Sequence, residues 1–394
     1  MRTVLISGAG VAGLSLAYWL RQHGFHPTLV ERAPGPRQGG QAVDLRGAAR
    51  EVVARMGLLD EVRAAHTGIR GIAWVDERGR RAAEMAADAL GDSGGVVADL
   101  EILRSDLVRI LHDAAGVDIE YRTEITALDE KPDGIRAAFA RGPARTFDVV
   151  VGADGIGSGV RSLVFGPDSV RDLGYHLGYF PARTRLDLDG WETVCNLPAG
   201  NGVGGRVVML YPLGASGECR VLVGFVSPKP LAPEENPAAV VAEAFAGAGW
   251  EIPALLEQLP DDLYFSRAGE VRLTEWHRGR TVLLGDAAFG GSLGMGTSLA
   301  LVGAYVLAGE LSTVDDPRTA FARYADEMRD YVAANRKRPP GGASGFAPRT
   351  RTGIRLRNAF LRALPHLPGR HRMLGGLQRS ANAITLKPYP ALRP

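Results

Sequence analysis

Three glycine-rich segments carry the residue types and spacings that could bind a nucleotide. The first reads Gly8-Ala-Gly10-Val-Ala-Gly13 and directly follows the apolar run Thr3–Ser7. Glycines at these places let a strand turn tightly into a helix, let the backbone approach a pyrophosphate, and let the helix pack closely on the strand. Free N–H groups at the start of that helix bind phosphate oxygens. The segment therefore predicts a site for the phosphates of a dinucleotide.

The acidic residue Glu31 lies where such a motif contacts ribose. A second apolar run, Pro27–Val30, ends at Glu31, 18 positions after Gly13. A carboxylate there accepts hydrogen bonds from ribose hydroxyls, and its charge repels a 2′-phosphate. We assign Glu31, Ala12 and Arg32 to the predicted nucleotide site together with the three glycines.

The second and third segments place a carboxylate directly after a buried strand. Asp154-Gly155 follows the apolar run Val149–Val151, and Gly285-Asp286 follows Val282–Leu284. The carboxyl ends of parallel strands form the ligand-binding edge of an α/β sheet, so both carboxylates are predicted to lie near the nucleotide. For Asp154, a plain Asp-Gly turn is the alternative.

The third segment continues to Gly294-Met295-Gly296 and then to an apolar stretch that predicts a helix over 297–311, capped by Thr297 or Ser298. The start of this helix would offer N–H groups and a positive dipole to an anionic ring. We therefore include Gly294, Met295 and Gly296 in the site. A glycine-rich connection without a function is the alternative.

Two arginines follow short predicted strands. Arg46 ends a strand over 41–45, and Arg104 precedes Ser105, the predicted N-cap of a helix that runs to Leu111. A helix start favours anions, so we predict that Arg104 contacts the bound cofactor. For Arg46, a ligand contact and a solvated surface arginine fit the sequence equally well.

Composition indicates a protein of ordinary globular character. The chain has 394 residues, 45% of them hydrophobic, which suffices for a sizeable core in two or three domains. No run reaches the ~18 apolar residues of a membrane span, and the N-terminus reads as a strand rather than a signal peptide. The two cysteines, Cys195 and Cys219, have no metal-binding spacing. We therefore expect a cytoplasmic protein without a metal site.

Charge is unevenly distributed along the chain. Residues 331–394 hold 13 Lys and Arg and no acidic residue, whereas residues 1–330 hold 33 basic and 44 acidic residues, a net charge of −11. A basic tail can bind nucleic acid or a membrane surface. No nucleic-acid motif accompanies it, so we favour packing of the tail against the acidic body.

Together, GAGVAG with Glu31, VVVGADG and LLGDAA resemble the single-component FAD-dependent aromatic monooxygenases, which share the fold of para-hydroxybenzoate hydroxylase and the tetracycline-modifying hydroxylases. The resemblance covers nearly the whole chain. It implies that Glu31 holds the adenosine ribose, Arg104 lies near the FAD phosphates and Asp286 holds the ribitol. It also implies that Asp154-Gly155 shapes the FAD and NADPH sites and that the Gly294–Gly296 backbone faces the flavin ring.

The expected fold class is α/β: a Rossmann-like FAD-binding domain, a mixed antiparallel β-sheet substrate domain and a C-terminal helical segment. Strand-like alternation over 69–85 and 175–227 supports the second domain. The predicted division is a discontinuous FAD-binding domain (1–68, 97–170 and 270–330), a substrate domain (69–96 and 171–269) and a basic helical segment (331–394).

The resemblance implies hydroxylation of an aromatic or polyketide-like small molecule with NAD(P)H and O2, by a monomer or homodimer. FAD would supply the chemistry, so no catalytic side chain is predicted. The segment after Asp286 departs from the family pattern, because it is short, lacks a proline and has Phe289 in place of a polar residue. This departure supports an alternative, a non-redox cyclase of polyketide biosynthesis that uses FAD structurally. A flavin-binding regulator is a third reading.

Overall fold

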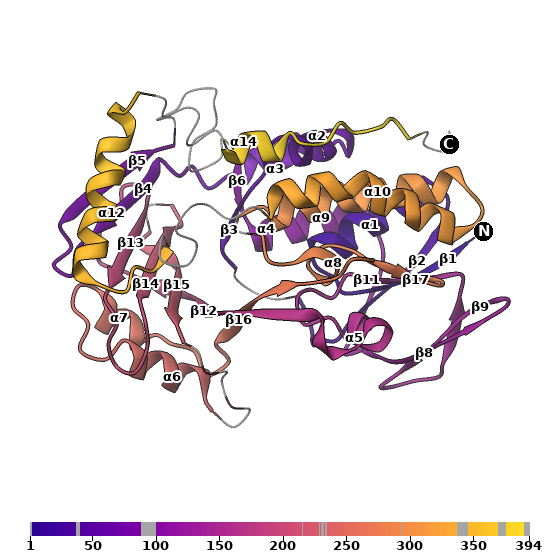
Figure 1. Cartoon of the computed structure of the whole chain (residues 1–394), viewed down its shortest axis with the longest axis horizontal. Helices are drawn as coiled ribbons and strands as arrows, with labels where there is room; N and C mark the ends of the chain where they lie inside the picture. The colour runs from indigo at the N-terminus through magenta and orange to yellow at the C-terminus, as the bar shows by residue number, and fades with distance from the viewer. Residues whose placement is uncertain are drawn as a thin grey trace.

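The computed structural model describes residues 2–36, 40–87, 100–214, 216–227, 229, 232, 235–292, 294–336, 346–368 and 376–389. The chain forms two lobes, here called the nucleotide lobe and the sheet lobe. Two long strands, β12 (Val170–Arg183) and β16 (Tyr264–Val271), run from one lobe into the other (Figure 1).

The nucleotide lobe is built on a six-stranded sheet in the order β17-β18-β11-β1-β2-β7. Its pairs are parallel except β17–β18. The strands are β1 (Thr3–Ser7), β2 (His26–Glu31), β7 (Ile119–Tyr121), β11 (Val149–Gly152), β17 (His277–Arg278) and β18 (Thr281–Leu283). The central strands are almost continuously apolar and buried, as expected for parallel strands covered on both faces.

Helices of the nucleotide lobe pack in layers on this sheet. Helix α9 (Gly296–Thr313) is buried along nearly its whole length because it contacts both α1 (Val11–Gln22) and α10 (Pro317–Asn335). The remaining helices are α2 (Ala48–Arg55), α3 (Leu59–Ala64), α4 (Arg104–Ala115), α5 (Gly159–Phe165) and α8 (Asp286–Phe289). A side sheet contains β8 (Ile125–Lys131), β9 (Gly134–Phe139) and β10 (Arg145–Phe147).

The sheet lobe is built on seven strands in the order β16-β12-β15-β14-β13-β4-β5, antiparallel except for the β13–β4 pair. The further strands are β4 (Gly71–Val75), β5 (Arg81–Ala86), β13 (Trp191–Leu197), β14 (Arg206–Pro212) and β15 (Glu218–Val226). One face packs with side chains from α6 (Pro237–Ala244) and α7 (Ile252–Leu256). Alternate residues of the same strands form a second apolar cluster on the other face, here called the inner face.

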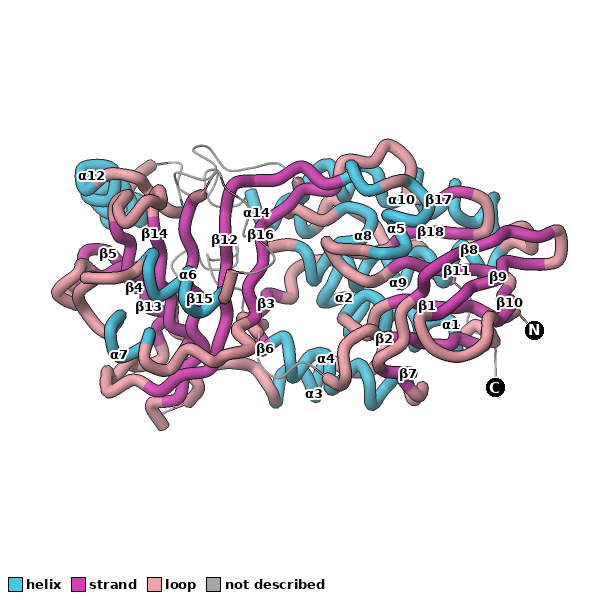
Figure 2. The backbone as a smooth tube through the Cα atoms, turned by 90° about the horizontal axis from the view of Figure 1, so that it is seen from below, coloured by secondary structure: helices cyan, strands magenta, loops and turns pink. Residues whose placement is uncertain are grey.

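A small sheet lies between the lobes. It pairs β3 (Ala42–Asp44) with β6 (Glu101–Leu103) in antiparallel register (Figure 2). Ala42 of β3 packs on the inner-face cluster. The small sheet therefore connects the nucleotide lobe with the inner face.

The basic C-terminal segment lies against both lobes. Helix α12 (Arg351–Ala363) contacts β5 and β13, and its Arg357 lies 5.8 Å from the centre of the Trp74 ring. After α14 (Gly376–Ala381), Lys387 pairs with Glu310 at 3.4 Å and with Glu327 at 2.6 Å. These contacts bear out the expected packing of the basic tail on acidic groups of the body.

Several local predictions need correction. Ser105 does not cap its helix, because α4 begins one residue earlier at Arg104. Neither Thr297 nor Ser298 caps α9, which begins at Gly296 without a side-chain cap. The predicted linker over 337–345 lies outside the described residues, and the predicted domain boundaries stay a prediction.

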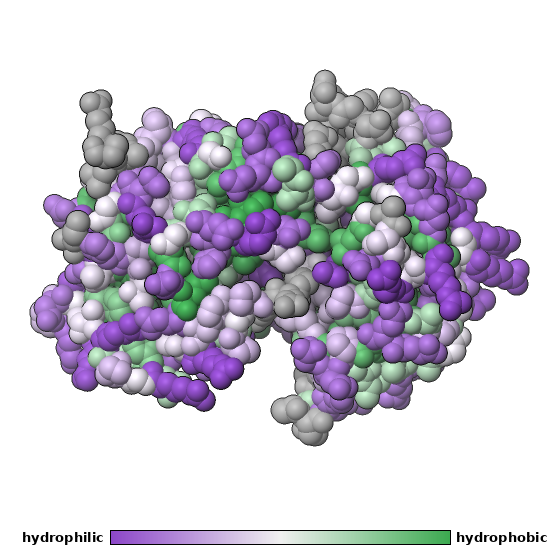
Figure 3. Space-filling view, turned by 180° about the vertical axis from the view of Figure 1, so that it is seen from behind, coloured by the Kyte–Doolittle hydropathy of each residue, from purple (hydrophilic) through white to green (hydrophobic). Residues whose placement is uncertain are grey.

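Within the described ranges, no helix combines the length and apolar character needed to cross a membrane. Seen from behind, hydrophilic side chains cover most of both lobes, and hydrophobic ones gather toward the middle (Figure 3).

Candidate functional site

The glycine turn after β1 is held by backbone contacts that only glycine permits. A Cβ on Gly13 would lie 1.9 Å from the carbonyl oxygen of Gly8. Gly8 has φ +107°, and a Cβ there would lie 2.5 Å from the carbonyl oxygen of Ala153. Gly10 precedes α1 in an extended conformation and adds no side-chain cap. The first N–H groups of α1 are thus available to an anion.

Glu31 lies at the end of β2 and faces the glycine turn. Its Oε2 accepts a hydrogen bond from the N–H of Ala9 at 3.0 Å, and its Oε1 accepts one from the N–H of Ala33 at 2.9 Å. Each carboxylate oxygen has a second lone pair, so Glu31 can still accept from ribose hydroxyls. Arg32 is exposed beside it.

Asp286 begins α8 and faces the start of α9. A Cβ on Gly296 would lie 3.6 Å from its Oδ1, and Gly285 packs against Ala12 of α1. The Asp286 side chain is open to solvent, yet surrounding protein raises its pKa, an effect that Arg104 partly opposes. Beside it lies the uncapped start of α9, with Met295 buried and Gly294 at φ +77°. Asp286, the start of α9 and Gly294–Gly296 are here called the Asp286 site.

Arg104, the first residue of α4, lies near the Asp286 site. Its Nη2 lies 3.6 Å from the place that a Cβ on Gly10 would occupy, and its aliphatic stem lies against Gly40. Burial raises the pKa values of Asp286 and Tyr179, and the charge of Arg104 opposes part of that rise. Arg104 is therefore near the glycine turn, near Asp286 and near the inner face.

Asp154 is placed differently from the other predicted site residues. Its Oδ1 accepts from Ser158 Oγ at 2.5 Å, and its Oδ2 accepts from the N–H of Val160 at 3.2 Å. The carboxylate thus binds the N-terminus of α5, while the backbone of Asp154 adjoins Gly8. Gly155, at φ +80°, has open space around it. The described contacts give the Asp154 side chain a structural role beside the glycine turn.

Arg46 is 4% exposed and pairs with Asp44 at 2.8 Å. The surface-arginine reading was therefore wrong. Phe289 is fully buried, with its ring centre 5.2 Å from that of Trp276. It belongs to the hydrophobic core of the nucleotide lobe.

Sequence reasoning missed the residues of the inner face. Tyr179 of β12 lies near Arg104, and burial raises its pKa to about 12. Glu192 of β13 and Glu101 of β6 are buried at the small sheet. Strand alternation placed such residues on one face, but the sequence does not show which face meets the nucleotide lobe.

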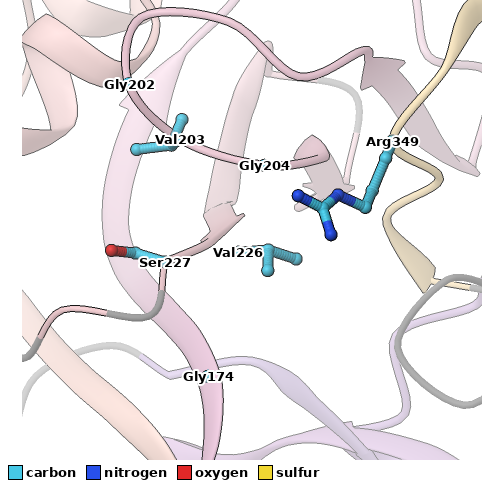
Figure 4. Close-up of a pocket in the computed structure, with 7 residues that line it drawn as sticks. All are labelled: Gly174, Gly202, Val203, Gly204, Val226, Ser227 and Arg349. Carbon is cyan, nitrogen blue, oxygen red and sulfur yellow. The ribbon is translucent and has the colours of Figure 1, made fainter.

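A cavity of about 440 Å³ opens where β12 enters the sheet lobe. It is lined by Gly174, Gly202, Val203, Gly204, Val226, Ser227 and Arg349. The Arg349 side chain extends from the C-terminal segment toward Gly204 (Figure 4). None of the predicted cofactor residues lines this cavity. In the part of the chain that the structure describes, no cluster of metal-ligating side chains occurs.

Known proteins are similar to this chain over most of its length. The family model of the FAD binding domain matches residues 1–336. An uncharacterized protein of Mycobacterium tuberculosis is 40% identical, covering 87% of this chain and 95% of its own length. A flavin-dependent monooxygenase from an unknown prokaryote is 35% identical, with coverages of 85% and 87%. The crystal structure of tetracycline destructase Tet(55) is 32% identical, with a TM-score of 0.80 and 99% of both chains covered.

The chain belongs to the FAD-binding-domain family. Within it, the chain is an FAD-dependent enzyme of the monooxygenase class, as the resemblance implied. The Diels-Alderase PyrE3 has a TM-score of 0.70 at 22% identity, which shows a shared fold alone. The comparisons therefore favour the monooxygenase reading over the cyclase.

Proposed function

We propose that the enzyme hydroxylates an aromatic or polyketide-like small molecule at the junction of the two lobes, with NAD(P)H and O2 as co-substrates. The observation that carries the proposal is the grouping of Asp286, Arg104 and the uncapped start of α9, with Tyr179 of the inner face near Arg104. The polar groups suit FAD, and the neighbouring apolar face suits a largely apolar substrate.

The residues present fit FAD. The glycine turn with Gly8, Gly10 and Gly13 offers uncapped N–H groups to the pyrophosphate, and Arg104 adds a positive charge nearby. Glu31 is fixed beside the turn and retains acceptor capacity for the adenosine ribose. Asp286 is solvent-accessible beside the start of α9, where a ribitol hydroxyl would donate a hydrogen bond to it.

The remaining assigned residues shape the site around Glu31, Arg104 and Asp286. Ala12 and Gly285 bring α1 and the start of α8 together, and Gly294, Met295 and Gly296 form the approach to α9. Arg32 lies exposed near the ribose end of the site, and Arg46 lies at the small sheet. We assign Asp154-Gly155 to the backbone framework around the glycine turn, because the carboxylate caps α5.

Bound FAD would supply the redox chemistry, that is, electron transfer from NAD(P)H and transfer of one oxygen atom of O2 to an electron-rich carbon. The chain's own residues bind, orient and exclude water. The uncapped start of α9 would favour negative charge on a bound group near it. Apolar side chains of the inner face, including Met209 and Leu222, exclude water from the substrate side. Tyr179 stays a neutral phenol at working pH and can donate a hydrogen bond to a substrate oxygen.

A stopped-flow experiment tests this function. The purified protein should be yellow, and NADPH under anaerobic conditions should bleach the flavin, faster when a polycyclic phenol is present. Readmitted O2 should be consumed with formation of a hydroxylated product. A colourless protein that does not bind added FAD would contradict the cofactor assignment. Cyclised product formed while the flavin stays oxidised would establish the cyclase instead.

A further inference from the structure

Two buried carboxyl groups meet where the small sheet touches the sheet lobe. Glu101 of β6 and Glu192 of β13 are 7% and 3% exposed, and their side chains hydrogen-bond to each other. Two ionised carboxylates have only acceptors, so this contact requires a proton on one of them. The FAD site and the proposed hydroxylation leave this pair without a role.

Glu101 is held firmly within its own lobe. Its Oε1 accepts a hydrogen bond from Thr67 Oγ1 at 2.7 Å, and its carbonyl oxygen accepts one from the N–H of Thr67 at 2.9 Å. In the register of the small sheet, Glu101 lies opposite Asp44, whose carboxylate binds Arg46 at 2.8 Å. The side chain of Glu101 therefore has one fixed partner in the nucleotide lobe and one in the sheet lobe.

The other titratable groups around the pair come from neighbouring elements. Tyr211 of β14, the strand beside β13, is buried and electrostatically coupled to Glu192. His66 forms a backbone bridge with Ile102 of β6, but His66 itself is exposed. Among the described residues named here, Arg46 is the cation whose charge favours ionisation of Glu101.

These surroundings favour protonation within the pair. Burial raises the pKa of Glu192 well above its ordinary range, and the charges of Glu101 and Asp44 raise it further. Burial also raises the pKa of Glu101 to about 7, although the Thr67 hydrogen bond opposes the rise. Both shifts favour the protonated form, so the pair retains a shared proton. The two groups titrate as a pair.

The pair is connected to the cofactor site through the backbone of the small sheet. Strand β6 runs directly into α4, whose first residue is Arg104, and the N–H of Arg104 donates to the carbonyl oxygen of Gln41 at 3.1 Å. Strand β3 leads within two residues to Arg46. The hydrogen bond between Glu101 and Glu192 therefore helps to fix the ends of β3 and β6, from which Arg46 and Arg104 extend.

We propose that Glu101 and Glu192 form a positioning device that shares one proton across the lobe junction and sets Arg104 for FAD binding. The effect on FAD binding rests on the proposed role of Arg104. The contact between Glu101 and Glu192, which joins the two lobes, does not depend on that role. Loss of the shared proton would place two like charges in a buried contact and drive the strands apart.

The first test is the pH profile of FAD affinity, measured by quenching of flavin fluorescence from about pH 6.5 to 9.5, a range above the ordinary carboxyl pKa. The affinity of the wild-type protein should fall roughly tenfold or more toward alkaline pH, as expected for loss of a hydrogen bond to a charged group. Glu192→Gln keeps an N–H donor at every pH and should flatten the profile. Glu192→Leu lacks a donor and should bind FAD weakly throughout.

A Glu192→Gln protein with the wild-type pH profile would overturn the proposal, and so would wild-type affinity in Glu192→Leu. If Glu192→Leu does not fold, Glu192→Gln still decides, because glutamine retains the volume and the donor. If Glu192 had only a structural role, Glu192→Gln would not remove the pH dependence of FAD affinity and at the same time preserve that affinity at neutral pH.

The second test separates the contact between the lobes from the role of Arg104. Both carboxyl groups have folded-state pKa values above the ordinary value of ~4.3, so the folded state binds more protons and its stability falls as pH rises above that value. The thermal midpoint of the full chain without added FAD should show this fall, and the double variant Glu101→Gln/Glu192→Gln should lose part of the slope. If the double variant keeps the wild-type slope of thermal midpoint against pH, proton sharing by Glu101 and Glu192 is overturned. If the double variant loses the slope but Arg104→Ala binds FAD like the wild type, only the role of Arg104 in FAD binding is overturned.

Discussion

In the nucleotide lobe the site consists mainly of backbone, whereas in the sheet lobe it consists of side chains. Gly8 and Gly13 have no space for a Cβ, and the uncapped starts of α1 and α9 present N–H groups. On the inner face, Tyr179 and Met209 are presented by a regular sheet that would accept other side chains at the same positions. Under the proposed function, the nucleotide lobe would fix which cofactor binds, and the sheet lobe would be free to set which substrate binds.

The largest expected effect comes from adding one methyl group to the glycine turn. In Gly13→Ala, the new Cβ would lie 1.9 Å from the carbonyl oxygen of Gly8, so α1 must move away from β1. Overpacking of this kind costs about 1–3 kcal/mol or more, so FAD affinity should fall roughly 10- to 100-fold. Equilibrium titration with FAD measures the loss.

Gly35→Ala is the matched control, because no atom lies within 4 Å of the Cβ that it would add. It should bind FAD like the wild-type protein. Equal FAD affinity in Gly13→Ala and Gly35→Ala would mean that the glycine turn does not bind the pyrophosphate. The proposed division of tasks between the lobes would then be wrong.

Asp286 is the side chain of the nucleotide lobe with the next largest expected effect. Asp286→Asn should weaken FAD binding roughly tenfold, because a charge-assisted hydrogen bond to ribitol becomes a neutral one. Burial raises the pKa of Asp286, so wild-type affinity should begin to fall at a higher pH than for an ordinary aspartate as the solution is acidified. The asparagine variant should lack this acid-side fall. An unchanged acid profile in Asp286→Asn would place the ribitol elsewhere.

The same contrast explains what the sequence predicted. Strand, glycine turn, helix and acid succeed one another within 31 residues, so the local spacing alone placed Gly8, Gly13 and Glu31 together. Asp286 and Arg104 were predicted because each follows a short strand at a recognisable motif. In these cases the backbone geometry that makes the site also constrains the sequence.

Elsewhere the sequence carried less information. The Asp-Gly pair at Asp154 looked like a ligand contact, but its carboxylate caps α5, and both roles use the same residue types. The contact between Glu101 and Glu192 joins strands 91 positions apart (192 minus 101). No periodicity within either strand predicts such a meeting, because it depends on how the lobes pack.

On the inner face, Tyr179→Phe should change substrate binding and leave the cofactor alone. Removal of one neutral hydrogen bond should raise KM about 2- to 10-fold, while FAD affinity stays unchanged. Tyr264→Phe is the control, because Tyr264 neighbours Tyr179 with a ring-centre distance of 6.1 Å but is 47% exposed. Weakened FAD binding in Tyr179→Phe would show that the two lobes do not divide their tasks in this way.

The smallest effect is expected from the C-terminal tail, where side chains join two parts of the nucleotide lobe without a backbone motif. Lys387 is half exposed, although it pairs with Glu327 and with the buried Glu310. Such pairs contribute at most about 1 kcal/mol, so Lys387→Met should lower the thermal midpoint by no more than a few degrees.

The hydrogen bond with Glu327 raises the pKa of Lys387, so the contribution of Lys387 to stability is full at neutral pH and is lost as pH rises through the folded-state pKa. The difference in midpoint between wild type and Lys387→Met should therefore vanish at strongly alkaline pH, with FAD affinity unchanged throughout. A loss of FAD affinity as large as that of Gly13→Ala would mean that side chains far from the turn also determine the cofactor site.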